Sequence, residues 1–163
     1  MTTMPRRLLP VALLLTLAAC AGEDKAPEPT AAAAVTPAAV ATGTLPGVTA
    51  AALPEALAQA YTVLAESAQG QPAEVFQAKA AAAGTGALPE PEAPMTPDLH
   101  RAEAALRIAL ANNAGALLPR EAATAQAAYD CWAVAERTGA PPSAAVDCRA
   151  LFGSSIRELW ARS

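Results

Sequence analysis

The chain has 163 residues, with 11 lysines and arginines against 15 aspartates and glutamates, and its formal net charge is −4. This acidic balance argues against nucleic acid and against an anionic lipid surface as partner, because both require a basic patch. The length allows one domain of ordinary size. Only two Phe, two Tyr and two Trp occur in the chain, so we expect a thin core of modest stability between closely packed helices.

The N-terminus carries a short apolar run behind two positive charges. Arg6 and Arg7 precede a run of 12 residues, 8–19, that is rich in Leu and Ala. A positive region, an apolar stretch and small residues before a cut are typical of a secretory signal peptide. One alternative is a transmembrane helix, but such a helix needs about 20 apolar residues. The other alternative is a plain secretory signal that a cysteine follows by chance.

Residues 17–20, Leu-Ala-Ala-Cys, resemble the lipobox of bacterial lipoproteins. The resemblance implies a signal peptide over residues 1–19, a diacylglycerol on the Cys20 thiol and an acylated new N-terminus. In the usual pattern of such lipoproteins, Asp after the cysteine retains the protein in the inner membrane, and this chain has Ala21 there. We therefore expect a lipid-anchored protein of the outer membrane that faces the periplasm. Its acyl chains would attach it firmly to the membrane, since two chains already suffice for stable anchoring.

Residues 20–50 comprise the cysteine that we expect to be lipidated and a segment after it. This segment is rich in Ala, Pro and Thr and shows no apolar period. Such a composition cannot bury enough surface to offset its ordering entropy. We therefore expect a disordered tether with an end-to-end distance of roughly 30 Å, which would hold a helical domain, residues 51–163, away from the membrane. A proline-rich recognition motif is the alternative, but the segment lacks a PxxP pair with basic neighbours.

The rest of the chain has helical periodicity, with proline or a capping residue at the helix starts and glycine at most of the ends. No segment alternates β-branched residues, so no sheet is expected. The predicted fold is all-α, a small bundle of about five helices. The helices are predicted from Leu53 to Gly70, from Pro72 to Gly84, from Thr96 to Gly115, from Pro119 to about Thr138 and from Pro141–Ser143 to about Arg162.

The cysteine count predicts a disulfide. If Cys20 carries lipid, Cys131 and Cys148 remain as an even pair in an oxidising compartment. They lie at similar distances from the turn at residues 139–142, hence at similar heights on adjacent antiparallel helices. A bond between them would staple this C-terminal helical hairpin and contribute about 3 kcal/mol. A redox-active or metal-binding pair is the rival interpretation, but there is no CxxC motif, and the only histidine, His100, is on another helix.

Aromatic and charged residues surround the two cysteines. Tyr129 and Trp132 are neighbours on one predicted helix, and Phe152 shares a face with Cys148 on the next. We expect Trp132 to fill the sparse core. Asp130 and Arg149 each adjoin a cysteine on facing helices, so they could form a surface ion pair worth about 0–1 kcal/mol. The functional alternative is that Asp130, Arg149 and Glu136 form a docking patch for a partner.

The same region resembles the helical module of OmpA-family lipoproteins. Residues 122–132 run from an Ala-rich helix through Ala-Gln into Tyr-Asp-Cys-Trp, and Cys148-Arg149 is followed by Phe152. The resemblance implies a structural motif made of Tyr129, Asp130, Trp132, Arg149 and Phe152. In that family the module follows a lipobox and precedes a peptidoglycan-binding OmpA-like domain, which we expect to be missing because the sequence stops at Ser163. What transfers is location and helical architecture, and a peptidoglycan-binding role does not.

The sequence leaves three classes of function open. The first is a non-enzymatic envelope lipoprotein with a structural or interaction role, the membrane as anchor and an envelope protein as possible partner. The second is a carrier of a small molecule or lipid between helices, which the scarcity of large apolar residues disfavours. The third is a cell-wall hydrolase, which would need a nucleophile with a base or paired acids in a cleft. The sequence favours the first, with no catalytic residue, metal, cofactor or small-molecule substrate predicted.

Overall fold

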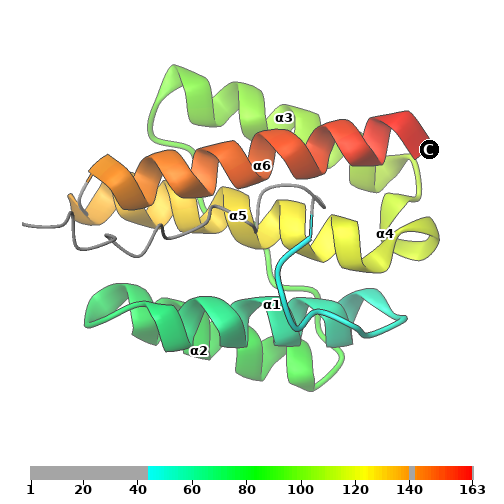
Figure 1. Ribbon diagram of the computed structural model, residues 1–163, viewed down its shortest axis with the longest axis horizontal. Coiled ribbons are helices and arrows are strands. Elements are labelled where there is room, and N and C mark those ends of the chain that lie inside the picture. The colour runs from blue at the N-terminus through cyan, green and yellow to red at the C-terminus, as the bar shows by residue number, and fades with distance from the viewer. Residues whose placement is uncertain (1–43, 140–141, 163) are drawn as a thin grey trace, which may run out of the picture. The chain divides into compact units, whose positions relative to one another are not determined.

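The part of the chain that the structure describes folds into six helices (Figure 1). The computed structural model describes residues 44–139 and 142–162, with the side chains of residues 142–146 left out of the description. The predicted signal peptide, Cys20 and most of the predicted tether lie outside these residues. No strand occurs in the described part of the chain, so the all-α class is confirmed. The helices are α1 (Leu53–Ser67), α2 (Gln71–Gly84), α3 (Pro97–Ala111), α4 (Ala114–Leu117), α5 (Pro119–Thr138) and α6 (Pro142–Arg162).

The expected start signals lie where the helices begin. Proline occupies the first turn of α1, α2, α3 and α5, where its missing N–H costs no hydrogen bond. The Thr96 side chain caps α3 by accepting a hydrogen bond of 3.3 Å from the Leu99 N–H. Gly139 ends α5 in the left-handed conformation, with φ of 67°, which glycine adopts without steric cost.

The third helix ends before Gly115, the residue that was expected to terminate it. Instead α3 stops at Ala111, Asn113 takes a left-handed conformation with φ of 66°, and the short helix α4 follows. Gly115 lies within α4, where a Cβ atom would come within 2.6 Å of Leu53 Cδ2. The glycine therefore permits a close approach between α4 and the start of α1.

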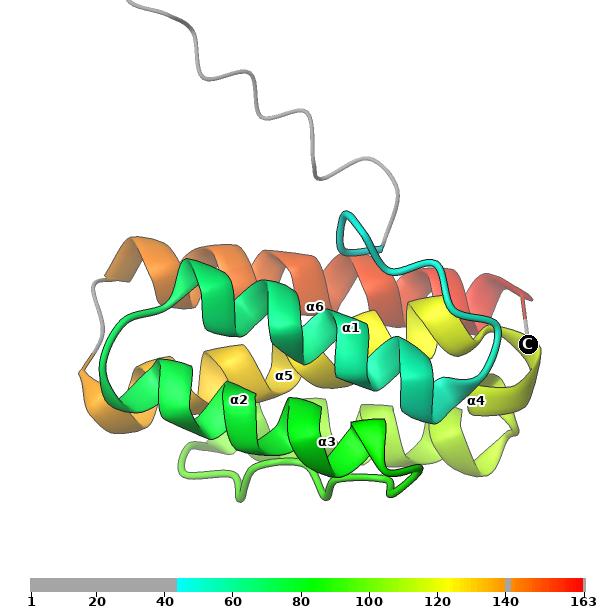
Figure 2. The same ribbon diagram turned by 90° about the horizontal axis from the view of Figure 1, so that it is seen from below.

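Helix α5 lies between two layers, α3 with α6 on one side and α1 with α2 on the other (Figures 1 and 2). It is buried along most of its length, and most of its buried residues are alanines. Small side chains let the neighbouring helices approach closely from several directions. One apolar cluster joins α5 to α3 and α6, and a second joins it to α1 and α2.

The end of the predicted tether packs against the bundle. The Leu45 N–H donates a 3.0 Å hydrogen bond to Thr124 Oγ1 on α5. Val48 is buried, and the N–H groups of Thr49 and Ala50 donate to Gln59 Oε1 on α1 at 2.8 and 3.0 Å. Residues 44–50 therefore belong with the helical domain rather than with a tether, because α1 and α5 supply acceptors for their backbone.

None of the helices among the described residues has the length and apolar character needed to cross a membrane.

Candidate functional site

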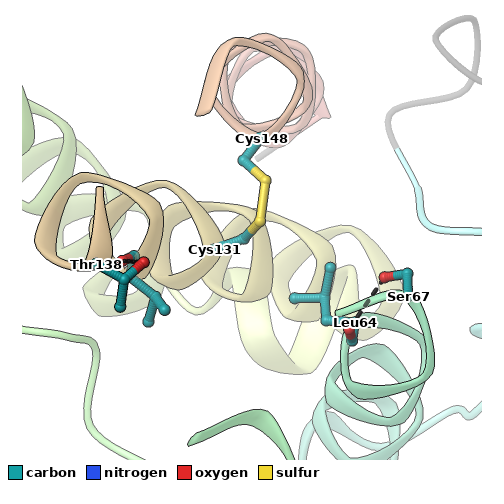
Figure 3. Close-up of a disulfide and its surroundings, with 6 residues drawn as sticks. Leu64, Ser67, Cys131, Thr138 and Cys148 are labelled. Carbon is teal, nitrogen blue, oxygen red and sulfur yellow. Dashed lines mark hydrogen bonds between the residues drawn. A yellow bond between two sulfur atoms is a disulfide. The ribbon is translucent and has the colours of Figure 1, made fainter. Parts of the chain in front are cut away.

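The two cysteines of the helical domain form a disulfide. Cys131 on α5 and Cys148 on α6 are bonded, with 5.8 Å between their Cα atoms, and Figure 3 shows the bond crossing between the two helices. The predicted staple of the C-terminal helical hairpin is thus confirmed. The bond closes the connection between α5 and α6 over 17 positions, so it restricts the unfolded chain more than the folded one.

An aromatic cluster lies between α5, α3 and α6. The ring centroid of Phe152 is 6.1 Å from that of Tyr129 and 6.5 Å from that of Trp132. Trp132 is only 4% exposed, and its Nε1 donates to Glu136 Oε1 at 3.2 Å. The Arg149 guanidinium lies 4.9 Å from the Trp132 ring centroid, within the range of a cation–π contact. The structure therefore brings four of the five motif residues together.

Asp130 departs from the expectation, and the predicted surface pair with Arg149 is wrong. Asp130 is 0% exposed, whereas Arg149 is exposed and pairs with Asp98 at 2.6 Å. The reason is helical geometry, since residues two apart on a helix point about 200° apart. Trp132 faces α3 and α6, so Asp130 faces α1 and α2. For the same reason the docking patch of Asp130, Arg149 and Glu136 does not form.

Asp130 instead lies at the centre of a buried polar cluster, which we call the Asp130 network; its members are Tyr61, Lys79, Glu92, Gln126 and Asp130. Asp130 Oδ2 accepts from the Tyr61 hydroxyl at 2.5 Å and from Lys79 Nζ at 2.9 Å. Asp130 Oδ1 accepts from the Glu92 N–H at 2.7 Å. Both carboxylate oxygens are therefore occupied by donors from three different segments.

The network fixes the irregular segment between α2 and α3, residues 85–96. Lys79 Nζ donates to the Glu90 carbonyl at 2.5 Å and lies 3.1 Å from Glu92 Oε1. Gln126 Nε2 donates to the Pro89 carbonyl at 2.6 Å and to the Tyr61 hydroxyl at 3.3 Å. Side chains of α2 and α5 thus supply partners that a segment without a helix or strand cannot supply to itself.

Two further bonds complete the attachment of this segment. The Tyr129 hydroxyl donates to the Glu92 carbonyl at 2.9 Å. Arg137 NH1 contacts Glu92 Oε2 at 2.5 Å. Among the described residues, no buried side-chain nitrogen or oxygen lacks a hydrogen-bond partner.

Burial and charge perturb the titration of the network. Burial raises the pKa of Asp130, and the nearby charge of Lys79 opposes that rise. Burial and the Asp130 charge raise the pKa of the Tyr61 hydroxyl well above its usual range. Burial also raises the pKa of Glu92, but hydrogen bonds from Arg137 and Lys79 outweigh it, so the net pKa is lowered. Perturbed groups can mark catalytic sites, but each of these carboxylates is bound by a cation.

Little in the sequence indicates this network. Tyr61 lies within the helix predicted from Leu53 to Gly70, and Glu92 lies between two predicted helices, so neither position indicates a buried polar contact. The available signal was the pair Gln126 and Asp130, polar residues four positions apart within an alanine-rich helix, a spacing that puts them on one face. Within the described residues no three His, Cys, Asp or Glu side chains gather to hold a metal ion, and His100 is exposed on α3.

Comparison of the chain with protein-family models, with curated proteins and with solved structures found no match.

Proposed function

We propose that this chain is a non-enzymatic lipoprotein, anchored to the outer membrane through Cys20, whose helical domain faces the periplasm and has a structural or interaction role in the envelope. The observation that carries the proposal is the Cys131–Cys148 disulfide. Disulfides persist in oxidising compartments such as the periplasm. Because this bond uses the other two thiols, it leaves Cys20 as the one cysteine for the lipid.

The Asp130 network supports a structural role over a hydrolytic one. A general acid or base must reach the proton that it transfers, but Asp130 is buried and both of its oxygens accept hydrogen bonds within the protein. Glu92 is bound by Lys79 and Arg137. Asp130 and Glu92 are therefore committed to holding the 85–96 segment in place rather than available as the paired acids of a hydrolase.

Two exposed apolar side chains support an interaction role. Trp160 on α6 is 57% exposed and Ile108 on α3 is 53% exposed, and both line one shallow depression with Asn112. Exposed aromatic residues beside other apolar side chains are typical of surfaces that contact another protein. This surface fits an envelope protein as partner.

Metabolic labelling with a palmitate analogue in a Gram-negative host tests the anchor. We expect the parent chain to be labelled and Cys20→Ala to be unlabelled and to remain an uncleaved precursor. The matched control replaces Cys131 and Cys148 together with Ser, which removes the same residue type and should keep the label. Equal labelling of Cys20→Ala and the parent would refute the lipoprotein proposal.

Membrane fractionation tests the location separately. The labelled parent should sediment with the outer membrane, and Ala21→Asp should move it to the inner membrane while leaving the label unchanged. A parent chain that fractionates with the inner membrane would overturn the outer-membrane assignment but not the lipidation.

A further inference from the structure

A groove of about 450 Å³ opens where the start of α1, the 85–96 segment, α3 and α4 meet. Leu53, Leu88 and Leu110 supply apolar walls, and the prolines at positions 89 and 91 extend them. Its volume falls within the range of small-molecule sites, about 300–1,000 Å³. The Asp130 network holds the 85–96 wall through the Pro89 and Glu90 carbonyls, so this side of the groove is formed in advance of any ligand.

A buried side chain offers an unused acceptor to this groove. Gln126 lines it and is only 3% exposed. Its amide orientation is fixed, because Nε2 must donate to the Pro89 carbonyl and to the Tyr61 hydroxyl, whose own proton goes to Asp130. Gln126 Oε1 therefore remains an acceptor, and no donor from the described residues reaches it. No fully buried side-chain oxygen in that part of the chain lacks a partner, so Oε1 keeps some accessible surface, and this groove is the pocket that Gln126 lines.

The charges around the groove favour a cation. Arg107 lines the groove, but its Nε and NH2 both donate to Glu103 Oε1, at 3.0 and 2.8 Å. Glu90 lines it as well; within residues 44–139 and 142–162 its exposed carboxylate forms no direct ion pair, but its charge acts on the Arg107 guanidinium. Counted together, Arg107, Glu90 and the neighbouring Glu103 leave a net negative charge beside the groove.

We propose that this groove binds a small amphiphile with a primary ammonium head and a short apolar body. The ammonium would donate to Gln126 Oε1 and face the Glu90 carboxylate, and the apolar body would lie against Leu53, Leu88 and Leu110. A carboxylate of the same length has no N–H or O–H to donate to Gln126 Oε1. It is also repelled by the Glu90 carboxylate. A neutral alcohol supplies the donor without the charge.

Nuclear magnetic resonance titration of the purified full chain tests this, with n-pentylammonium, n-pentanol and pentanoate as probes of equal length. We expect saturable shifts at the groove residues, including the Gln126 side-chain amide, with pentylammonium bound most tightly and pentanoate least. Glu90→Gln should weaken pentylammonium binding by about two- to fivefold, the range of an exposed ion pair, and leave pentanol binding unchanged. Leu88→Ser, at an exposed position, should weaken pentylammonium and pentanol alike.

Glu74→Gln is the matched control, because Glu74 is an exposed glutamate on α2 that does not line the groove. It should bind all three probes as the parent does. Pentanoate binding as tight as pentylammonium, an absence of saturable shifts in the groove, or equal effects of Glu90→Gln and Glu74→Gln would each overturn the proposal.

Discussion

On the side of α5 that faces α3 and α6, Trp132 and Phe152 pack together beside the disulfide that joins α5 to α6. The side that faces α1 and α2 instead buries the Lys79–Asp130 ion pair and its hydrogen-bond partners. Aromatic packing and a covalent bond are insensitive to moderate changes of pH. A buried ion pair is costly to break and depends on protonation. One alanine-rich helix thus carries two stabilising arrangements that respond to different perturbations.

The largest effect should come from the aromatic side. Trp132→Ala removes the largest side chain of that cluster and leaves a cavity, for which we expect a loss of about 3–5 kcal/mol in unfolding free energy. Urea unfolding followed by circular dichroism measures it. Trp160→Ala is the matched control, because Trp160 is exposed on α6, and it should unfold at nearly the parent urea concentration. If Trp132→Ala unfolds like the control, the cluster does not stabilise the fold.

The disulfide should contribute slightly less. Replacing Cys131 and Cys148 together with Ser should cost about 3 kcal/mol in unfolding free energy, because the unfolded chain regains the entropy of the closed loop. The measurement is urea unfolding of the double variant against the parent, each with and without reductant. Reductant should lower the stability of the parent and leave that of the double variant unchanged.

On the network side, Asp130→Asn tests the buried pair. We expect a loss of about 1–3 kcal/mol, the cost of leaving a buried polar group unsatisfied, because an amide nitrogen would replace an acceptor that two segments use. Asp98→Asn is the control, since Asp98 belongs to an exposed pair with Arg149 and should change stability by about 0–1 kcal/mol. Equal thermal melting of the two variants would place Asp130 in a solvated setting and contradict its burial.

The starts of the helices could be predicted from the sequence, because proline and the Thr96 cap act locally. The helices that pack on each side of α5 could not be predicted. A helix surrounded on several sides carries no single apolar stripe, so its alanines do not reveal which side Asp130 faces. The role of Gly115 could not be predicted for a similar reason, since the requirement for glycine there comes from Leu53, which is distant in sequence.

Acid titration should give the smallest of these effects. Burial raises the pKa of Glu92, but hydrogen bonds donated by Arg137 and Lys79 outweigh it and lower the net pKa below its ordinary value of 4.5. Its stabilising contribution is therefore present above that value and is lost as pH falls through the folded-state pKa. Burial raises the pKa of Asp130, so its contribution has the opposite sign, and stability falls as pH rises through the interval between its unfolded and folded pKa values.

Melting temperatures measured between about pH 3 and pH 6 separate these contributions. We expect Glu92→Gln to reduce the loss of stability on acidification, because the variant lacks the carboxylate whose stabilising contribution is lost as pH falls. Glu74→Gln, an exposed control on α2, should keep the parent's pH dependence. A Glu92→Gln profile that runs parallel to the parent's would contradict the assignment of this pH dependence to Glu92.

Amide hydrogen exchange of the folded protein tests most directly whether the two sides of α5 are held independently. Under conditions in which the chain stays folded, reductant should speed exchange in α6 and leave the 85–96 segment protected. Asp130→Asn should speed exchange at the Glu92 N–H and leave α6 protected. If each perturbation instead speeds exchange equally on both sides of α5, the two arrangements form one cooperative unit, which contradicts their independence.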